Sequence, residues 1–174
     1  MQRAQLIELL TKTHPGVAFP PILFIGIRGY YMRTMGDPTR NDRAIYDDAI
    51  FILTNNELHA FNANCDPAHH RPGIANLKAG IWPVYRFDLH NRQYLALCQR
   101  AGKVTVMRDG KGDDTGNFGI NIHRGGNIVT GSLGCQTIPP SQWDRFINTA
   151  KRIAMRVYGD TYAKEKYTYV LIEN

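Results

Sequence analysis

The residues best suited to chemistry lie close together, between Gly119 and Gln136. A cysteine attacks a carbonyl carbon as the thiolate, so it needs a base or a positive environment to lose its proton. A histidine can take that proton and return it to a leaving amine near neutral pH. Cys135 and His123 are therefore the candidate nucleophile and base of an acyl-transfer site.

Glycines flank both residues. Gly134 directly precedes the cysteine, and Gly125 follows the histidine by two positions. Glycines let backbone amides approach a reacting carbonyl, so we expect these two to supply oxyanion donors. Ser132 is a third candidate catalytic residue, whose hydroxyl either caps a turn or holds the imidazole by a hydrogen bond. A helix beginning soon after Cys135 would favour the thiolate.

Each of these residues also has an ordinary structural interpretation. A cysteine taken alone is often a small buried hydrophobe, and a histidine at a strand end is often only hydrogen-bonded there. The glycines serve backbone conformation whether or not the protein is an enzyme. We favour catalysis because the two reactive residue types occur together in a glycine-rich context.

The motif resembles that of the L,D-transpeptidase family, cysteine enzymes that act on bacterial peptidoglycan. In that family a strand ends in Ile-His-Gly, a glycine-containing loop follows, and Ser-x-Gly-Cys leads into a helix. Here the matching segments are Ile122-His123 with Gly125, and Ser132-Leu133-Gly134-Cys135. The histidine precedes the cysteine, the reverse of papain-like and NlpC/P60-like peptidases. The resemblance covers residues 118–147, extends less closely over 49–117, and is not seen in 1–45.

The resemblance implies a single L,D-transpeptidase-like catalytic domain over residues 1–174, with 1–45 as an N-terminal extension. The implied fold is mostly β, a β-sandwich or barrel, with one substantial helix. The implied reaction cleaves or exchanges an amide bond in peptidoglycan stem peptides through an acyl-enzyme on Cys135. We expect hydrolysis, as an L,D-carboxypeptidase or endopeptidase, rather than cross-linking. The expected substrate-binding residues are Arg124, Trp82 and Tyr85, and no metal or cofactor is expected.

The sequence departs from the family at two positions near the cysteine. Leu133 stands where the family has a second histidine, and Thr137 stands where it has an arginine. An arginine presents a planar fork to a carboxylate, and Arg124 or Arg108 is the candidate to replace it. The departures keep two alternatives open: a non-enzymatic wall-binding module that retains the fold, and an intracellular acyltransferase with another amide substrate.

Mostly β-type segments must position these residues. β-Branched and aromatic runs predict strands at 22–31, 49–54, 58–62, 80–89, 93–99, 104–108, 118–123 and 167–172. Helical spacing of apolar residues predicts a short helix at 2–12 and a longer one at 141–158. Ser141 and Asp144 resemble a capping box at the start of the longer helix. Residues 35–43 and 64–76 read as loops, and 109–114 as a turn.

Composition is that of a folded globular domain, with 43% hydrophobic and 21% charged residues. The net charge of +6 permits acidic partners. Because the charges are spread along the chain and no zinc-finger or basic-helix pattern occurs, we expect no nucleic-acid partner. The three cysteines cannot all pair with one another, so at least one thiol should be free. Cys65 and Cys98 read as structural.

Several histidines invite a metal interpretation. His69 and His70 lie near Asp66 in a loop, and His59 lies upstream. Loop histidines without fixed spacing are usually solvated, and these could instead line a substrate cleft.

The N-terminus lacks the apolar core and cleavage site of a signal peptide. The most apolar stretch, residues 17–27, is too short to span a bilayer, so no transmembrane segment is expected. We therefore expect a protein made without a standard export signal that acts at the bacterial cell wall, in the periplasm, after delivery. A phage lysin or an interbacterial toxin fits that expectation, with a delivery or immunity protein as a possible partner.

Overall fold

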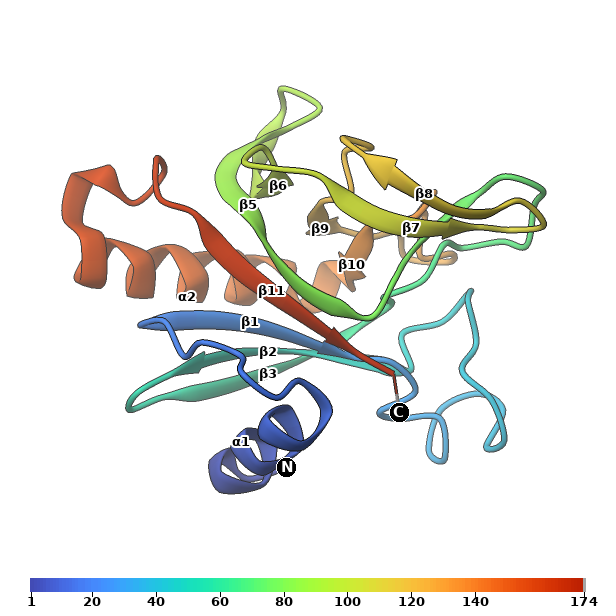
Figure 1. The fold of residues 1–174 in the computed structure, drawn as a ribbon, viewed down its shortest axis with the longest axis horizontal. Helices are drawn as coiled ribbons and strands as arrows, with labels where there is room; N and C mark the ends of the chain where they lie inside the picture. Colours follow the sequence, from blue (N-terminus) through green and yellow to red (C-terminus); the bar gives the residue numbers. More distant parts are fainter. Residues whose placement is uncertain (174) are drawn as a thin grey trace.

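The computed structural model describes residues 1–173, which form eleven strands, two α-helices and one short 3-10 helix (Figure 1). In chain order the elements are α1 (Arg3–Thr13), β1 (Ile22–Ile27), β2 (Asp48–Thr54), β3 (Leu58–Ala63), β4 (Ala75–Leu77), β5 (Gly80–His90), β6 (Tyr94–Gln99), β7 (Val104–Arg108), β8 (Gly112–Gly116), β9 (Ile122–Arg124), β10 (Gln136–Ile138), α2 (Pro140–Tyr158), η1 (Gly159–Thr161) and β11 (Tyr167–Ile172). The prediction of a mostly β fold with one substantial helix is confirmed.

Eight strands form one sheet in the order β10-β9-β6-β5-β11-β1-β2-β3. Just beyond β3, Asn64 forms an isolated antiparallel bridge with Thr137 of β10. The bridge consists of two backbone hydrogen bonds, of 2.9 and 2.8 Å. Because it joins the two edge strands of the sheet, the sheet curls into a nearly closed barrel. The strands β4, β7 and β8 form a separate three-stranded sheet.

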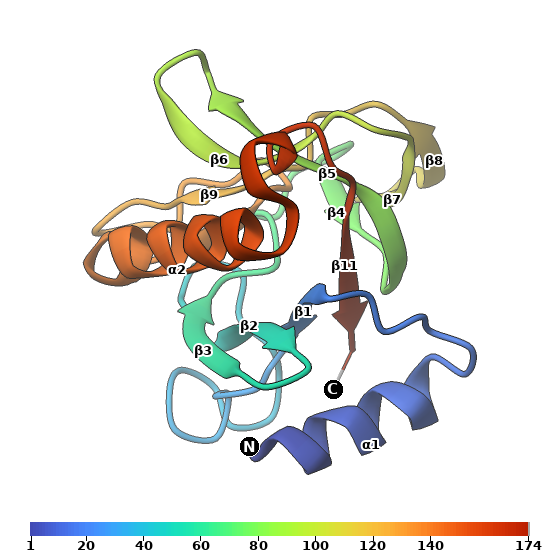
Figure 2. The same ribbon diagram turned by 90° about the vertical axis from the view of Figure 1, so that its left-hand side faces the viewer.

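Two apolar clusters hold the sheet from opposite sides. Alternate residues of β1 belong to different clusters: Ile22 and Phe24 to one, Leu23 and Ile25 to the other. Helix α2 contributes to the first cluster and helix α1 to the second. Figure 2 shows the two helices on opposite sides of β1 and β2. Strand β1 is buried on both faces and lies between β11 and β2, so residues 22–27 of the expected N-terminal extension are part of the main sheet.

Helix α2 starts differently from the prediction. It begins at Pro140, its N-cap residue is Pro139, and no side chain caps it. Proline suits the first helical position because its missing N–H would have no partner there and its φ angle already fits. The capping box of Ser141 and Asp144 is therefore wrong.

The predicted strands also need correction around the site. Of the strand expected at 118–123, only residues 122 and 123 are in a strand, β9. Strand β8 begins at Gly112, inside the turn expected at 109–114. Strand β8 has the polar sequence GDDTG, and it is held by pairing with β7 and by an ion pair between Arg108 and Asp114 (2.7 Å). The first strand ends at Ile27 because Gly29 turns the chain with φ of 62°.

No helix within residues 1–173 combines the length and the apolar character needed to cross a bilayer.

Candidate active site

The pairing of strands β9 and β10 sets the spacing between the two candidate catalytic residues. They pair in parallel, with Ile122 opposite Gln136 and His123 opposite Thr137. Cys135 directly precedes β10, so its place in this register is beside Asn121, two residues before His123. Neighbouring strands lie about 4.8 Å apart and rise about 3.3 Å per residue, so such diagonal neighbours have backbones about 8 Å apart. A cysteine and a histidine side chain on one face can meet across that gap.

The imidazole of His123 has a defined tautomer. Its Nδ1 lies 2.8 Å from the carbonyl oxygen of Arg124. A carbonyl oxygen only accepts, so Nδ1 carries the proton and Nε2 has a free lone pair. Burial is the main cause that lowers the pKa of His123, to about 4, and the neighbouring His90 adds to the effect. The ring is therefore neutral near pH 7 and able to accept a proton.

A second histidine, His90, belongs to the site. It ends β5, and its ring stacks on that of His123 with centroids 4.1 Å apart and planes 15° apart. Its Nδ1 lies 3.1 Å from the side-chain amide nitrogen of Asn121. Sequence reasoning missed His90, because a single histidine at a strand end carries no local signal of its partners.

The thiol of Cys135 is partly buried and hydrogen-bonded. It donates to the carbonyl oxygen of Gly119 (3.3 Å), and its sulfur accepts from the backbone N–H of Asn121 (3.4 Å). Burial raises the pKa of the Cys135 thiol, and the Asn121 amide opposes this by a smaller amount. The resting sulfur is therefore a thiol, so it must lose its proton during attack.

Ser132 shapes the loop that carries the cysteine. Its hydroxyl donates to the carbonyl oxygen of Cys135 (2.6 Å) and accepts from the N–H of Gly134 (2.9 Å). Of the two roles expected for Ser132, the structure shows the first: its hydroxyl caps the turn, and within residues 1–173 it makes no hydrogen bond to the imidazole. It is a positioning residue, and the catalytic assignment is corrected.

The expected oxyanion donors are already engaged. The N–H of Gly134 bonds Ser132, and the N–H of Gly125 donates to the carbonyl oxygen of Ile138 (2.9 Å). Neither amide is available to a substrate in this conformation. The N–H of Cys135 itself has no acceptor within residues 1–173. It therefore remains free to act as an oxyanion donor.

A buried polar chain supports the cysteine loop from inside the barrel. The side-chain amide of Gln136 donates to the carbonyl oxygen of Gly134 (3.2 Å), and its oxygen accepts from the hydroxyl of Tyr169 (3.0 Å). The thiol of Cys65 lies 3.5 Å from the same hydroxyl. Cys65 and Cys98 are both fully buried and unpaired, which agrees with their structural interpretation.

The expected aromatic substrate contacts are not at the site. Tyr85 has no exposed surface and packs edge-on against Tyr169, so its assignment as a substrate-binding residue is wrong. Trp82 lies near the start of β5, where its indole N–H donates to the carbonyl oxygen of Lys78 (3.0 Å). Trp82 and His90 are eight residues apart on one strand, which is about 26 Å measured along the strand.

The arginines considered for carboxylate binding have other contacts. The guanidinium of Arg124 lies over the ring of Tyr94, 5.3 Å from its centroid. Arg108 pairs with Asp114 and lies over Phe118.

The two departures from the family differ in exposure. Thr137 is fully buried, whereas Leu133 is 65% exposed beside the cysteine. Ile128 and Val129 are also exposed in the loop that precedes Ser132. The loop between β9 and Cys135 therefore exposes several apolar side chains.

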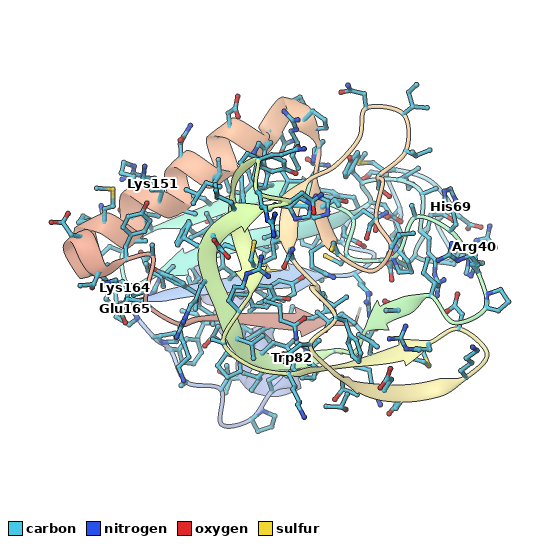
Figure 3. All side chains as sticks on the ribbon, turned by 90° about the horizontal axis from the view of Figure 1, so that it is seen from above. Arg40, His69, Trp82, Lys151, Lys164 and Glu165 are labelled. Atoms are coloured by element: carbon cyan, nitrogen blue, oxygen red, sulfur yellow. The ribbon has the colours of Figure 1, made fainter. Side chains whose placement is uncertain are left out.

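The loop histidines lie in a separate hollow. His69 and His70, with residues 40–45 and Ala68, line a cavity of about 770 Å³. Figure 3 shows Arg40 and His69 side by side at this edge of the molecule. Asp66 pairs instead with the buried Arg28 (3.0 Å), and His59 with Glu57 (2.9 Å). Within residues 1–173, no three histidine, cysteine or acidic side chains are grouped as a metal would require.

The sequence matches no protein-family model, and comparison with the curated proteins and with the solved structures gives no match. Function is therefore inferred from the geometry of the site and from the resemblance of its motif.

Proposed function

We propose that the protein is a cysteine enzyme that cleaves or exchanges an amide bond in peptidoglycan stem peptides, with Cys135 as nucleophile and His123 as base. One observation supports the proposal: His123 is paired with Thr137, two residues after Cys135, and the Arg124 carbonyl leaves Nε2 of His123 free to accept a proton. The choice of peptidoglycan follows from the resemblance of the motif to that of the L,D-transpeptidases.

In the first half-reaction, the sulfur of Cys135 attacks the carbonyl carbon while its proton passes to Nε2 of His123. The oxygen of the tetrahedral intermediate accepts a hydrogen bond from the backbone N–H of Cys135. The carbon–nitrogen bond then breaks, and His123 returns the proton to the leaving amine. The product is a thioester on Cys135.

In the second half-reaction, water or an amine attacks the thioester while His123 takes the acceptor's proton. The carbon–sulfur bond breaks, and the proton returns to the sulfur. Water gives hydrolysis, as an L,D-carboxypeptidase or endopeptidase, and an amine gives transpeptidation. We expect hydrolysis as the main outcome, at the cell wall after delivery of the protein.

One observation favours a second candidate, a wall-binding module without activity. The thiol is bonded to the Gly119 carbonyl, and its pKa is raised rather than lowered. A thiol that stays in this state is inert. The enzyme requires the thiol to turn from Gly119 to His123 when substrate binds.

The deciding experiment incubates the wild type, Cys135→Ala and His123→Gln with peptidoglycan and with soluble stem peptides, and reads the products by mass spectrometry. Loss of a residue or of a cross-link with the wild type alone supports the enzyme, and the product mass identifies the bond. Unchanged substrate in all three samples, with equal binding to the wall polymer, supports the module instead.

A further inference from the structure

His90 contacts the site through two partners. Its ring stacks on His123, and its Nδ1 meets the side chain of Asn121, whose backbone N–H faces the sulfur of Cys135. One residue of β5 therefore touches both the candidate base and the residue that contacts the nucleophile.

The hydrogen bonds around Asn121 make Nδ1 of His90 an acceptor. The N–H of Gln99 donates to Oδ1 of Asn121 (2.9 Å), which sets the orientation of this amide. The Asn121 NH2 group must then face Nδ1 of His90, which can only accept. At the other ring nitrogen, the side-chain amide nitrogen of Asn91 lies 3.1 Å from Nε2. A neutral His90 ring with its proton on Nε2 therefore needs the Asn91 amide to turn its oxygen towards Nε2. An imidazolium would place two donors against each other at Nδ1.

The β5–β6 hairpin holds His90 over β9. His90 pairs with Tyr94, and the turn between them uses positive φ angles at Asn91 (50°) and Arg92 (60°). Two such residues make the tight turn that matches the twist of a hairpin. The ring of Tyr94 lies 5.5 Å from that of His90, so His90 is packed between its own hairpin and His123.

We propose that His90 is a positioning residue for the base: its face fixes the plane of the His123 imidazole, while the Arg124 carbonyl fixes its tautomer. The inference rests on the proposed function of Cys135 and His123. Burial lowers the pKa of both histidines, so two neutral rings stack near pH 7 without charge repulsion. A base held in one plane enters the proton transfer without first losing rotational freedom.

The test compares two substitutions of similar volume. His90→Leu removes the flat face and His90→Phe keeps it, and neither retains the bond to Asn121. His70→Leu, at an exposed histidine outside the site, is the control. We expect His90→Leu to lower kcat by about 10- to 100-fold with KM unchanged, and His90→Phe to recover most of that loss. Wild-type kcat in His90→Leu would overturn the proposal, as would failure of phenylalanine to rescue it.

A spectroscopic readout works without catalysis. The ring current of a stacked neighbour shifts the carbon-bound protons of His123 upfield in the NMR spectrum. We expect that shift in the wild type and in His90→Phe, and its loss in His90→Leu. An unshifted His123 in the wild type would refute the stack even if the protein is active. A shifted His123 in a wild type that leaves peptidoglycan unchanged would instead refute the proposed function alone. If His90→Leu does not fold, the wild type and His90→Phe still decide.

Discussion

Gly26 lies directly against the hydroxyl of Tyr169, and a Cβ atom at position 26 would overlap that hydroxyl. The same hydroxyl donates to Gln136, whose side-chain amide in turn donates to the carbonyl oxygen of Gly134, next to Cys135. Gly26 of β1 is thus linked, through Tyr169 and Gln136, to the loop that carries Cys135 on the opposite side of the barrel.

Gly26→Ala should therefore destabilise the protein by about 1–3 kcal/mol, because the added methyl group displaces a buried ring in a packed core. Tyr169→Phe should cost about 1 kcal/mol for the lost hydrogen bond. The double variant should lose at least about 1 kcal/mol less than the sum, because removing the hydroxyl makes room for the methyl group. Urea unfolding measures all three. Additive effects would show that the two residues do not meet.

Ser132→Ala should lower both stability and activity without changing the pH dependence. The hydroxyl makes two hydrogen bonds within the loop and none with the imidazole, so we expect a loss of about 1–3 kcal/mol and a reduced kcat. Ser141→Ala, at an exposed serine of α2, is the control and should stay within about 0.5 kcal/mol of the wild type. A displaced acid limb of kcat/KM in Ser132→Ala would show that the hydroxyl acts on His123 after all.

The pKa of His123 predicts a stability change below neutral pH. The unfolded histidine binds a proton near pH 6.5, whereas burial lowers the folded pKa to about 4. Between these values the unfolded state binds more protons, so stability falls as the pH decreases from 6.5 towards 4. The loss reaches about 3 kcal/mol for this one group.

The measurement needs a reference variant. Burial raises the pKa of Asp47 to about 6 and also raises that of Asp48, so these carboxyl groups oppose the effect in the same range. His123→Gln keeps both carboxyl groups and removes the histidine. The free energy of unfolding of the wild type, minus that of His123→Gln, should fall between pH 7 and pH 4. A constant difference would mean that the pKa of His123 is the same in the folded and the unfolded protein.

Arg28→Met should destabilise the protein by about 3–5 kcal/mol, because it leaves the buried carboxylate of Asp66 without its cation. Adding Asp66→Asn should recover part of that loss. Arg40→Met, at an exposed arginine paired with Asp37 and Asp42, should change stability by about 1 kcal/mol or less. Chemical unfolding of the three variants and the wild type measures these changes, and an equal loss in Arg28→Met with and without Asp66→Asn would contradict the prediction.

The sequence predicts the regular part of the fold well. Long strands with β-branched and aromatic residues, such as β1 and β11, are identified by composition, and α2 is identified by its apolar spacing. Asn55-Asn56, between the strands predicted at 49–54 and 58–62, predicts a turn and an antiparallel hairpin, and β2 and β3 pair in this way. Strands β4 and β10 have three residues each, too few to show a periodic pattern.

The site is predicted only in part, for a physical reason. The types of His123 and Cys135 are visible in the chain, but the groups that tune them are supplied by long-range pairing. His90 reaches His123 only because β5, β6 and β9 are neighbours in the sheet. Hydrogen bonds that occupy the amides of Gly125 and Gly134 likewise depend on the fold and not on the presence of glycine.

The closure of the barrel has a mechanical consequence for the site. Three register pairs join β9 to β10, whereas one pair joins β9 to β6 and one bridge joins β10 to the chain after β3. The two strands β9 and β10, which hold the proposed base and follow the proposed nucleophile, are therefore joined to each other by more pairings than join them to the strands on either side. When the contacts of β9 with β6 and of β10 with the chain after β3 open transiently, His123 and Cys135 move together and keep their relative register. Amide hydrogens at Ile122 and Thr137 should then exchange with solvent before those of β1 and β11.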